Sequence, residues 1–183
     1  PVSFNLLSSH NKKTRIREAN GNIDKRSNGY KRREKAVMNT HHAATDLVAQ
    51  AKAFGVPAEY VLFDSWFSYP KLILKMREMG YHTISVLKDM NRVFYLHDNR
   101  WIRLSDVYAS IKNKCTEPGK IHIGTVTVQF RDKSNNLYPL KIAFVREKGN
   151  KREWIAVGTT DTSLSQEEIV RIYGKRWAIE VFF

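Results

Sequence analysis

The spacing of hydrophobic and polar residues predicts alternating strands and helices in the first half of the chain. Residues 2–8 alternate like a strand, and residues 36–54 place apolar side chains at helical intervals. Residues 60–63, Tyr-Val-Leu-Phe, are continuously apolar, which is typical of a strand buried on both faces of an α/β sheet. A helix over residues 70–79 and a strand over residues 82–87 follow.

The second half begins with a β-rich stretch. Polar turns separate alternating apolar segments at residues 93–102, 121–130 and 138–146. A short helical signal lies near residues 105–113. A last apolar strand, residues 154–158, precedes a helix that begins at about Ser165, where Glu168 completes a capping box. This order predicts an α/β fold with a β-rich insertion, residues 89–150, before the last helix.

Both ends of the sequence fall inside elements. The chain opens on the apparent strand without a Met, and it closes at Phe183 inside the last helix. Because natural domains seldom begin and end within an element, we expect the chain to be a fragment of a longer protein.

The net charge of the chain indicates what kind of partner it binds. Lys and Arg number 31 against 18 acids, a net charge of +13. Such an excess favours a polyanion, above all nucleic acid, although many soluble proteins are simply basic. A membrane surface is the alternative, but no apolar run could span a bilayer and no basic amphipathic helix has an apolar face. Cys115 is the single cysteine and no signal peptide is visible, which fits a reducing, cytoplasmic interior.

Asp64 is the first candidate for chemistry. It follows directly after the apolar run 60–63, at the end of the strand where open α/β sheets place their ligands. A carboxylate there is a candidate metal ligand. The alternative is that Asp64 simply caps the helix that follows.

Glu180 is the second candidate, because of the residues around it. Tyr173, Arg176 and Glu180 are three and then four residues apart, so they share one face of the last helix. That helix is apolar nearly all round and is expected to be buried, where charged groups need partners. Either Arg176 and Glu180 form an internal ion pair, or the carboxylate binds a metal while Arg176 and Tyr173 face a phosphate.

A basic segment, residues 25–35, includes Lys31, Arg32 and Arg33 beside Tyr30. It either binds a DNA backbone or forms a solvated loop. Trp101 and Trp154 are expected in the core, with stacking on a base as the alternative.

Three sequence blocks resemble one known family. The sequence Tyr173-Gly-Lys-Arg176-Trp-Ala-Ile-Glu180 resembles the Y-x2-R-x3-E part of the Y-x2-R-x3-E-x6-K signature of the IS-four family of bacterial insertion-sequence transposases. Residues 60–67 resemble that family's second-aspartate motif. Residues 4–9 and 23–33 resemble the stretch between its first and second aspartates, so the similarity spans nearly the whole chain.

The resemblance implies an RNase H-like mixed sheet flanked by helices, with a DDE triad that binds two divalent ions, Mg²⁺ or Mn²⁺. Residues 1–88 and 151–183 would form the core around the insertion. Asp64 and Glu180 would be catalytic metal ligands, and Arg176, with Tyr173 and Lys175, would hold a phosphate. The implied partners are double-stranded DNA, at transposon ends and targets, and further copies of the protein in a synaptic complex.

Two parts of the family pattern are missing. The first aspartate should lie upstream of Pro1, and the signature Lys should fall seven residues beyond Glu180. We therefore expect no strand transfer by residues 1–183 alone. Two other functions stay open: a structure-specific nuclease of the same fold, and a non-catalytic DNA-binding relative.

Overall fold

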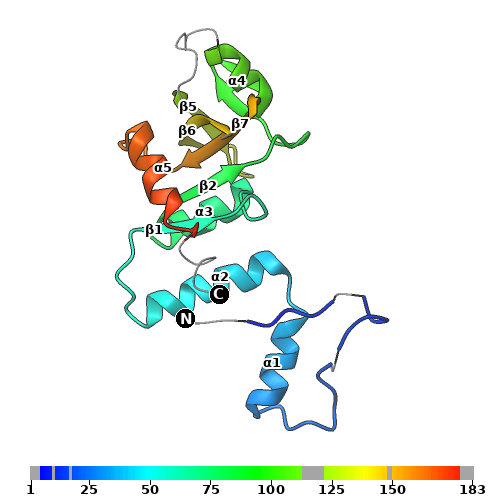
Figure 1. Cartoon of the computed structure of the whole chain (residues 1–183). Coiled ribbons are helices and arrows are strands. Elements are labelled where there is room, and N and C mark those ends of the chain that lie inside the picture. The colour runs from blue at the N-terminus through cyan, green and yellow to red at the C-terminus, as the bar shows by residue number, and fades with distance from the viewer. Residues whose placement is uncertain (1–4, 10, 17, 113–121, 148–149, 178–183) are drawn as a thin grey trace. The chain divides into compact units, whose positions relative to one another are not determined.

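The computed structural model describes residues 5–9, 11–16, 18–112, 122–147 and 150–177. The chain divides into two compact units, Pro1–Pro57 and Ala58–Phe183 (Figure 1).

The first unit contains two helices with polar caps. They are α1 (Asn28–Ala36) and α2 (Thr40–Ala53). Ser27 accepts a hydrogen bond from the Tyr30 N–H, and Asn39 accepts one from the His41 N–H. The helix expected over residues 36–54 therefore begins later, after the Asn39 cap. The polar segment that precedes it forms α1, a second helix that its sequence spacing did not predict.

The strand expected at residues 2–8 is wrong where the structure describes it. Residues 5–8 belong to no strand. The Ser8 N–H instead donates to the carbonyl of Ala36, 2.6 Å away, at the end of α1. Apolar alternation cannot make a strand without a neighbouring backbone to pair with. Residues 2–4 lie outside the described residues.

The second unit is built on a mixed sheet. Its strands are β1 (Tyr60–Phe63), β2 (His82–Leu87), β3 (Tyr95–His97), β4 (Arg100–Ile102), β5 (His122–Arg131), β6 (Leu137–Glu147) and β7 (Asn150–Thr159). The seven strands lie in the order β1-β2-β7-β6-β5-β3-β4 (Figure 1). β1 and β2 are parallel, and every other described pair is antiparallel. The strands of the β-rich stretch thus extend the sheet that β1 and β2 begin.

Helices cover both faces of this sheet. They are α3 (Pro70–Glu78), α4 (Leu104–Lys112) and α5 (Gln166–Gly174). One buried cluster joins Ile73 of α3 and Val107 of α4 to Leu87 of β2, and a second joins Ile169 of α5 to Ile84 of β2. Even and odd positions of a strand face opposite sides, so α5 lies on the face opposite α3 and α4. A mixed sheet between helices confirms the expected α/β class.

The sequence patterns located most of these elements. The strands at residues 60–63 and 82–87 and the short helix near residues 105–113 are confirmed. Asp132 closes the turn between β5 and β6 by accepting two N–H groups, those of Ser134 and Asn136. The expected boundaries of the insertion at residues 89–150 stay a prediction.

A polar contact ties the loop after β7 to the starts of β1 and β2. The Tyr60 hydroxyl donates to Asp161 Oδ2, 2.6 Å away. Thr160 Oγ1 accepts the Thr83 N–H at 3.0 Å and lies 3.4 Å from His82 Nδ1. Because α5 follows this loop directly, the contact fixes where α5 enters the face of the sheet.

Gly158 lies where an added side chain would press against Leu87. It lies opposite Ser85 in β2, and a Cβ there would lie 2.8 Å from Leu87 Cδ1. Gly158→Ala should therefore lower the free energy of unfolding by about 1–3 kcal/mol, measured by urea denaturation. Gly174→Ala is the control, because nothing lies within 4 Å of its Cβ position. That change should be neutral or add up to about 1 kcal/mol, because alanine favours the helix. An equal loss in both variants would contradict the close packing at Gly158.

The contact between Tyr60 and Asp161 should make stability depend on pH. The hydrogen bond to Asp161, followed by burial, raises the pKa of Tyr60 to about 12. Burial would raise the pKa of Asp161, but hydrogen bonds from Ser163 and Tyr60 outweigh it and hold that pKa below its ordinary value. The stabilisation from Tyr60 is then complete below pH ~10 and lost as pH rises through its folded pKa; that from Asp161 is complete above pH ~4 and lost in acid.

Tyr60→Phe should therefore lower the free energy of unfolding by about 1 kcal/mol at neutral pH, with the difference shrinking below pH ~4 and above pH ~10. Urea titrations at several pH values measure this. Tyr108→Phe is the matched control, because Tyr108 stacks on Trp154 at 4.6 Å through its ring. A difference that stayed constant with pH would refute the contribution of the contact.

Candidate functional site

Asp64 lies at the carboxyl end of β1, held in a tight turn. Its Oδ1 accepts the backbone N–H of Trp66 at 2.8 Å, and its carbonyl accepts the N–H of Phe67 at 3.2 Å. The helix-cap alternative does not hold, because the N-cap of α3 is Tyr69, five residues on, and it has no side-chain cap bond. Asp64 therefore orders the turn and not the start of the helix.

The carboxylate of Asp64 suits a hard cation as one ligand of several. The residue is half-buried, and no described Lys, Arg or His forms an ion pair with it. The turn uses Oδ1, and no hydrogen bond is described for Oδ2. Carboxylate oxygens are the ligands that Mg²⁺ and Mn²⁺ prefer. Within the described part of the chain, no three His, Cys, Asp or Glu side chains gather closely enough to hold a metal ion.

Tyr173 lies on the last described helix, α5, and Lys175 and Arg176 follow directly after it. Ser165 and Glu168 form the expected capping box, which starts α5. At its beginning, Gln166 Nε2 donates to the Phe144 carbonyl in β6, and near its end Tyr173 packs in the cluster that includes Ile84 of β2. α5 thus crosses from β6 toward β2, the neighbour of the strand that precedes Asp64 (Figure 1).

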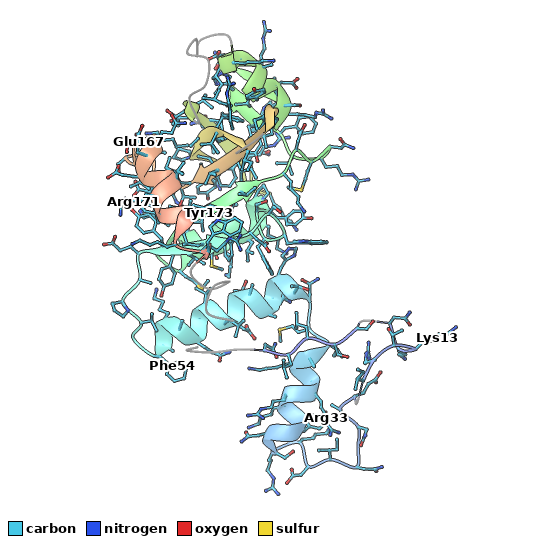
Figure 2. The ribbon with its side chains drawn as sticks, in the orientation of Figure 1. Lys13, Arg33, Phe54, Glu167, Arg171 and Tyr173 are labelled. Atoms are coloured by element: carbon cyan, nitrogen blue, oxygen red, sulfur yellow. The ribbon has the colours of Figure 1, made fainter. Side chains whose placement is uncertain are left out.

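Tyr173 and Arg176 form one unit at the end of this helix. Tyr173 is 9% exposed and faces the sheet, whereas the exposed Glu167 and Arg171 point away from it (Figure 2). Arg176 Nε donates to the Tyr173 hydroxyl at 3.1 Å, and its guanidinium lies 5.3 Å from the ring of Trp177. The two side chains predicted to act on a phosphate therefore touch each other.

Glu180 lies outside the described residues, so the choice between an ion pair with Arg176 and a metal ligand stays open. Lys175, at the C-cap of α5, is exposed.

Position along β1 links Asp64 to the face that α5 covers. Tyr60 and Leu62 pack in the same cluster as Ile169 and Tyr173. Side chains alternate along a strand, so position 64 continues the row of Tyr60 and Leu62. Asp64 thus follows the row on the α5 side of the sheet.

The basic candidates belong to the first unit. Lys31, Arg32 and Arg33 lie on α1, which has no buried residue. Lys31 and Arg32 help to line a cavity of about 380 Å³ between α1 and α2, together with Asp46 of α2. The solvated-loop alternative is wrong in one respect: the segment is an exposed helix.

The aromatic side chains correct one expectation and add one residue. Trp154 is partly buried and packs against the core, but Trp101 is 38% exposed, with Arg131 4.6 Å over its ring. Trp101 lies on β4, the edge strand, whose outer side has no covering element in the described sheet. Trp66, which the sequence analysis missed, is 71% exposed two residues after Asp64. Its position two residues after Asp64 was the sequence signal that could have identified Trp66 as a candidate.

No helix in the described part of the chain is both long enough and apolar enough to cross a membrane.

Comparison with known proteins adds the family. None of the curated proteins compared with the chain matches it significantly. A family model described as the transposase DDE domain matches residues 24–183, which is most of the chain. The mixed sheet with helices on both faces agrees with the RNase H-like fold of such domains. The chain therefore belongs to the transposase DDE domain family.

Proposed function

We propose that the chain forms part of the catalytic domain of a bacterial transposase of the IS-four kind, which cuts and joins DNA strands at transposon ends. The observation that carries this proposal is the place of Asp64. It stands at the carboxyl end of β1, on the row that leads to α5, in a DDE domain. Open α/β sheets bind their ligands at the carboxyl ends of strands, and in this proposal Asp64 shares a cation there with Glu180.

In this proposal Asp64 and Glu180 hold divalent ions, Mg²⁺ or Mn²⁺. When bound, such ions activate the attacking oxygen and stabilise the leaving oxygen of an in-line displacement at phosphorus. The turn after β1 presents Asp64 by occupying its Oδ1 with the Trp66 N–H. This bond keeps the carboxylate in one orientation and leaves Oδ2 for a ligand.

Arg176, Tyr173 and Lys175 would position the phosphate. Arginine binds phosphate oxygens in a bidentate manner, and the bond to the Tyr173 hydroxyl holds its side chain in place before DNA arrives. Tyr173 is itself anchored in the core. Lys175 would add a charge at the exposed end of the helix.

The basic helix α1 would bind the DNA backbone. The first turn of α1 contains no acidic residue. Contacts to phosphates from Lys31, Arg32 and Arg33 would not depend on base sequence. The partners in this proposal are double-stranded transposon ends, target DNA and other copies of the protein in a synaptic complex. The protein would work on nucleoid DNA in the bacterial cytoplasm.

A metal-binding measurement tests the role of Asp64. Asp64→Asn should weaken Mn²⁺ binding at least about tenfold, because it removes a charged ligand, and the free ion can be followed by electron paramagnetic resonance. Asp98→Asn, at an exposed position of the β3–β4 turn, is the control and should leave Mn²⁺ binding unchanged. Equal binding by the Asp64 variant and the unchanged chain would remove Asp64 from the site.

Glu180→Gln should weaken Mn²⁺ binding in the same way.

Only Asp64 and Glu180 of the three expected carboxylates are assigned to this chain, so residues 1–183 alone should bind end DNA without cutting it. A gel assay with labelled transposon-end and random duplexes measures both the binding and the cleavage of DNA. Cleavage of end DNA by this chain would overturn the expected inactivity, and cutting without preference for ends would favour a structure-specific nuclease.

The charges of α1 should appear in the salt dependence of DNA binding. Replacing Lys31, Arg32 and Arg33 together by Gln should reduce the slope of log affinity against log salt by about 2–3, because each phosphate contact contributes about 0.9. Replacing Arg92, Lys112 and Lys133, three exposed basic residues elsewhere, is the matched control. An equal reduction in both triple variants would mean that net charge alone, and not α1, binds DNA.

A further inference from the structure

The sheet of the second unit is partly open on the face that α5 covers. Cross-strand register puts six side chains of β3, β4, β5 and β6 in two adjacent rows, Trp101, Leu96, Gln129 and Pro139, then Arg131 and Leu137. They lie on the α5 side, because Leu137 and Ala143 are both odd positions of β6 and Ala143 packs with Ile169 of α5. α5 runs from β6 toward β2 and leaves Leu137 45% and Trp101 38% exposed. These six residues are called the open half-face.

Arg131 is the cation of the open half-face. Its guanidinium carbon lies 4.6 Å from the centre of the Trp101 ring, and no acid in the described part of the chain forms an ion pair with it. Tryptophan and arginine are enriched at the centres of protein interfaces. Surfaces that bind duplex DNA are more polar and carry many more cations. One arginine among apolar side chains therefore favours a protein partner that brings a carboxylate.

The start of α5 carries the complementary charge. Its first turn contains Glu167 and Glu168, and the capping box with Ser165 occupies Glu168. Glu167 is exposed and points away from the sheet (Figure 2), and none of the ion pairs of the described residues includes it. This turn begins over β6, where Gln166 Nε2 donates to the Phe144 carbonyl at 3.0 Å. The other end of β6 belongs to the open half-face, so the acidic turn and the open half-face share one strand.

A helix beside an open sheet face forms a step, and two such steps are complementary when a twofold axis relates them. We propose that two copies of the chain pair in this way, with α5 of each copy against the open half-face of the other. Glu167 of one copy would pair with the partner's Arg131, and the twofold axis makes this contact twice, which closes the assembly at a dimer. The inference rests on the proposed function, since it names the surface through which copies would meet in a synaptic complex.

The net charge of +13 on each chain opposes any pairing of two copies. This repulsion acts over long distances, and salt at about 0.15 M screens exposed charges that are more than about 8 Å apart. Charges in contact at a partly buried interface are screened much less. The charge pair can therefore favour the dimer at this salt concentration, which is the condition for the experiment.

Sedimentation equilibrium of the chain, without DNA and at concentrations up to about 100 µM, measures the pairing. The unchanged chain should show a monomer–dimer equilibrium. Arg131→Glu and Glu167→Lys should each raise the dissociation constant at least about tenfold, because each change places like charges together at both contacts. The variant that combines the two changes should return to within about threefold of the unchanged chain, because the pair forms again with its charges exchanged.

Arg77→Glu is the matched control. Arg77 is also exposed and lies over an aromatic ring, 5.5 Å from the centre of Tyr138, but it belongs to α3, on the opposite face of the sheet. This variant should leave the dissociation constant within about twofold of the unchanged chain. A chain that stays monomeric would overturn the inference, as would equal losses with Arg131→Glu and Arg77→Glu. A combined variant that does not recover would overturn it too, since recovery is the result that misfolding cannot produce.

Two readouts separate this inference from the proposed function. Asp64→Asn should dimerise like the unchanged chain, and Arg131→Glu should keep Mn²⁺ binding. Arg131→Glu should also bind a random duplex as tightly as Arg77→Glu, which has the same net charge. A weaker duplex affinity of Arg131→Glu with an unchanged dimer would mean that the open half-face binds DNA, which overturns the inference and leaves the proposed function standing. A dimer that depends on Arg131, with Mn²⁺ binding that does not depend on Asp64, would refute only the proposed metal site.

Discussion

β2 is hydrogen-bonded on both sides, to β1 in parallel and to β7 in antiparallel register. Both of its faces are covered as well, with Ile84 under α5 and Leu87 under α3 and α4. Several other parts of the second unit are aligned through this strand. β1 gains a partner from it, β7 is aligned by it, and the loop after β7 returns to its first residues through Thr160 and Thr83. Close approach of β7 also explains why a glycine stands at position 158, against Leu87.

The candidate site is a consequence of that alignment. Asp64 emerges one residue after β1 ends, at the edge where the parallel pair finishes. The contact of Tyr60 with Asp161 holds the loop before α5 at the start of β1. α5 then places Tyr173, with Arg176 bonded to it, on the face of the sheet that this helix covers. Distant segments of the sequence therefore contribute to one side of the sheet. Trp66 lies in the turn after β1 and Lys88 follows β2 directly, so the two parallel strands also bring these side chains together.

Sequence patterns predicted the parts of the fold that depend on local composition. The apolar run at residues 60–63, the Pro70 start of α3 and the capping box at Ser165 are visible in any reading of the chain, because short-range rules govern them. The strand expected at residues 2–8 is wrong for residues 5–8, the part that the structure describes, because pairing is not a local property. α1 was missed because its side chains are nearly all polar, so no apolar face marks it. For the site, position after a strand singled out Asp64.

Other contributions to the site could not be read from the sequence. The exposure of Trp66 depends on which neighbours cover its turn, and the same is true of Trp101, which was expected in the core. The bond between Tyr60 and Asp161 joins residues about one hundred positions apart, and no spacing rule connects them. Such contacts are set by the whole sheet, so they become visible only when the strand order is known.

The strand order has a consequence for how this protein acquires its shape. β7 pairs with β2 on one side and with β6 on the other. β5, β6 and β7 follow one another through short connections and can pair early, whereas joining β7 to β2 closes a loop of more than sixty residues at a larger entropic cost. The β-rich segment is therefore a scaffold on which the helix after β7 is set in place. Deleting β3–β6 would remove the strand that pairs with one edge of β7, so the segment supports the strand from which α5 follows.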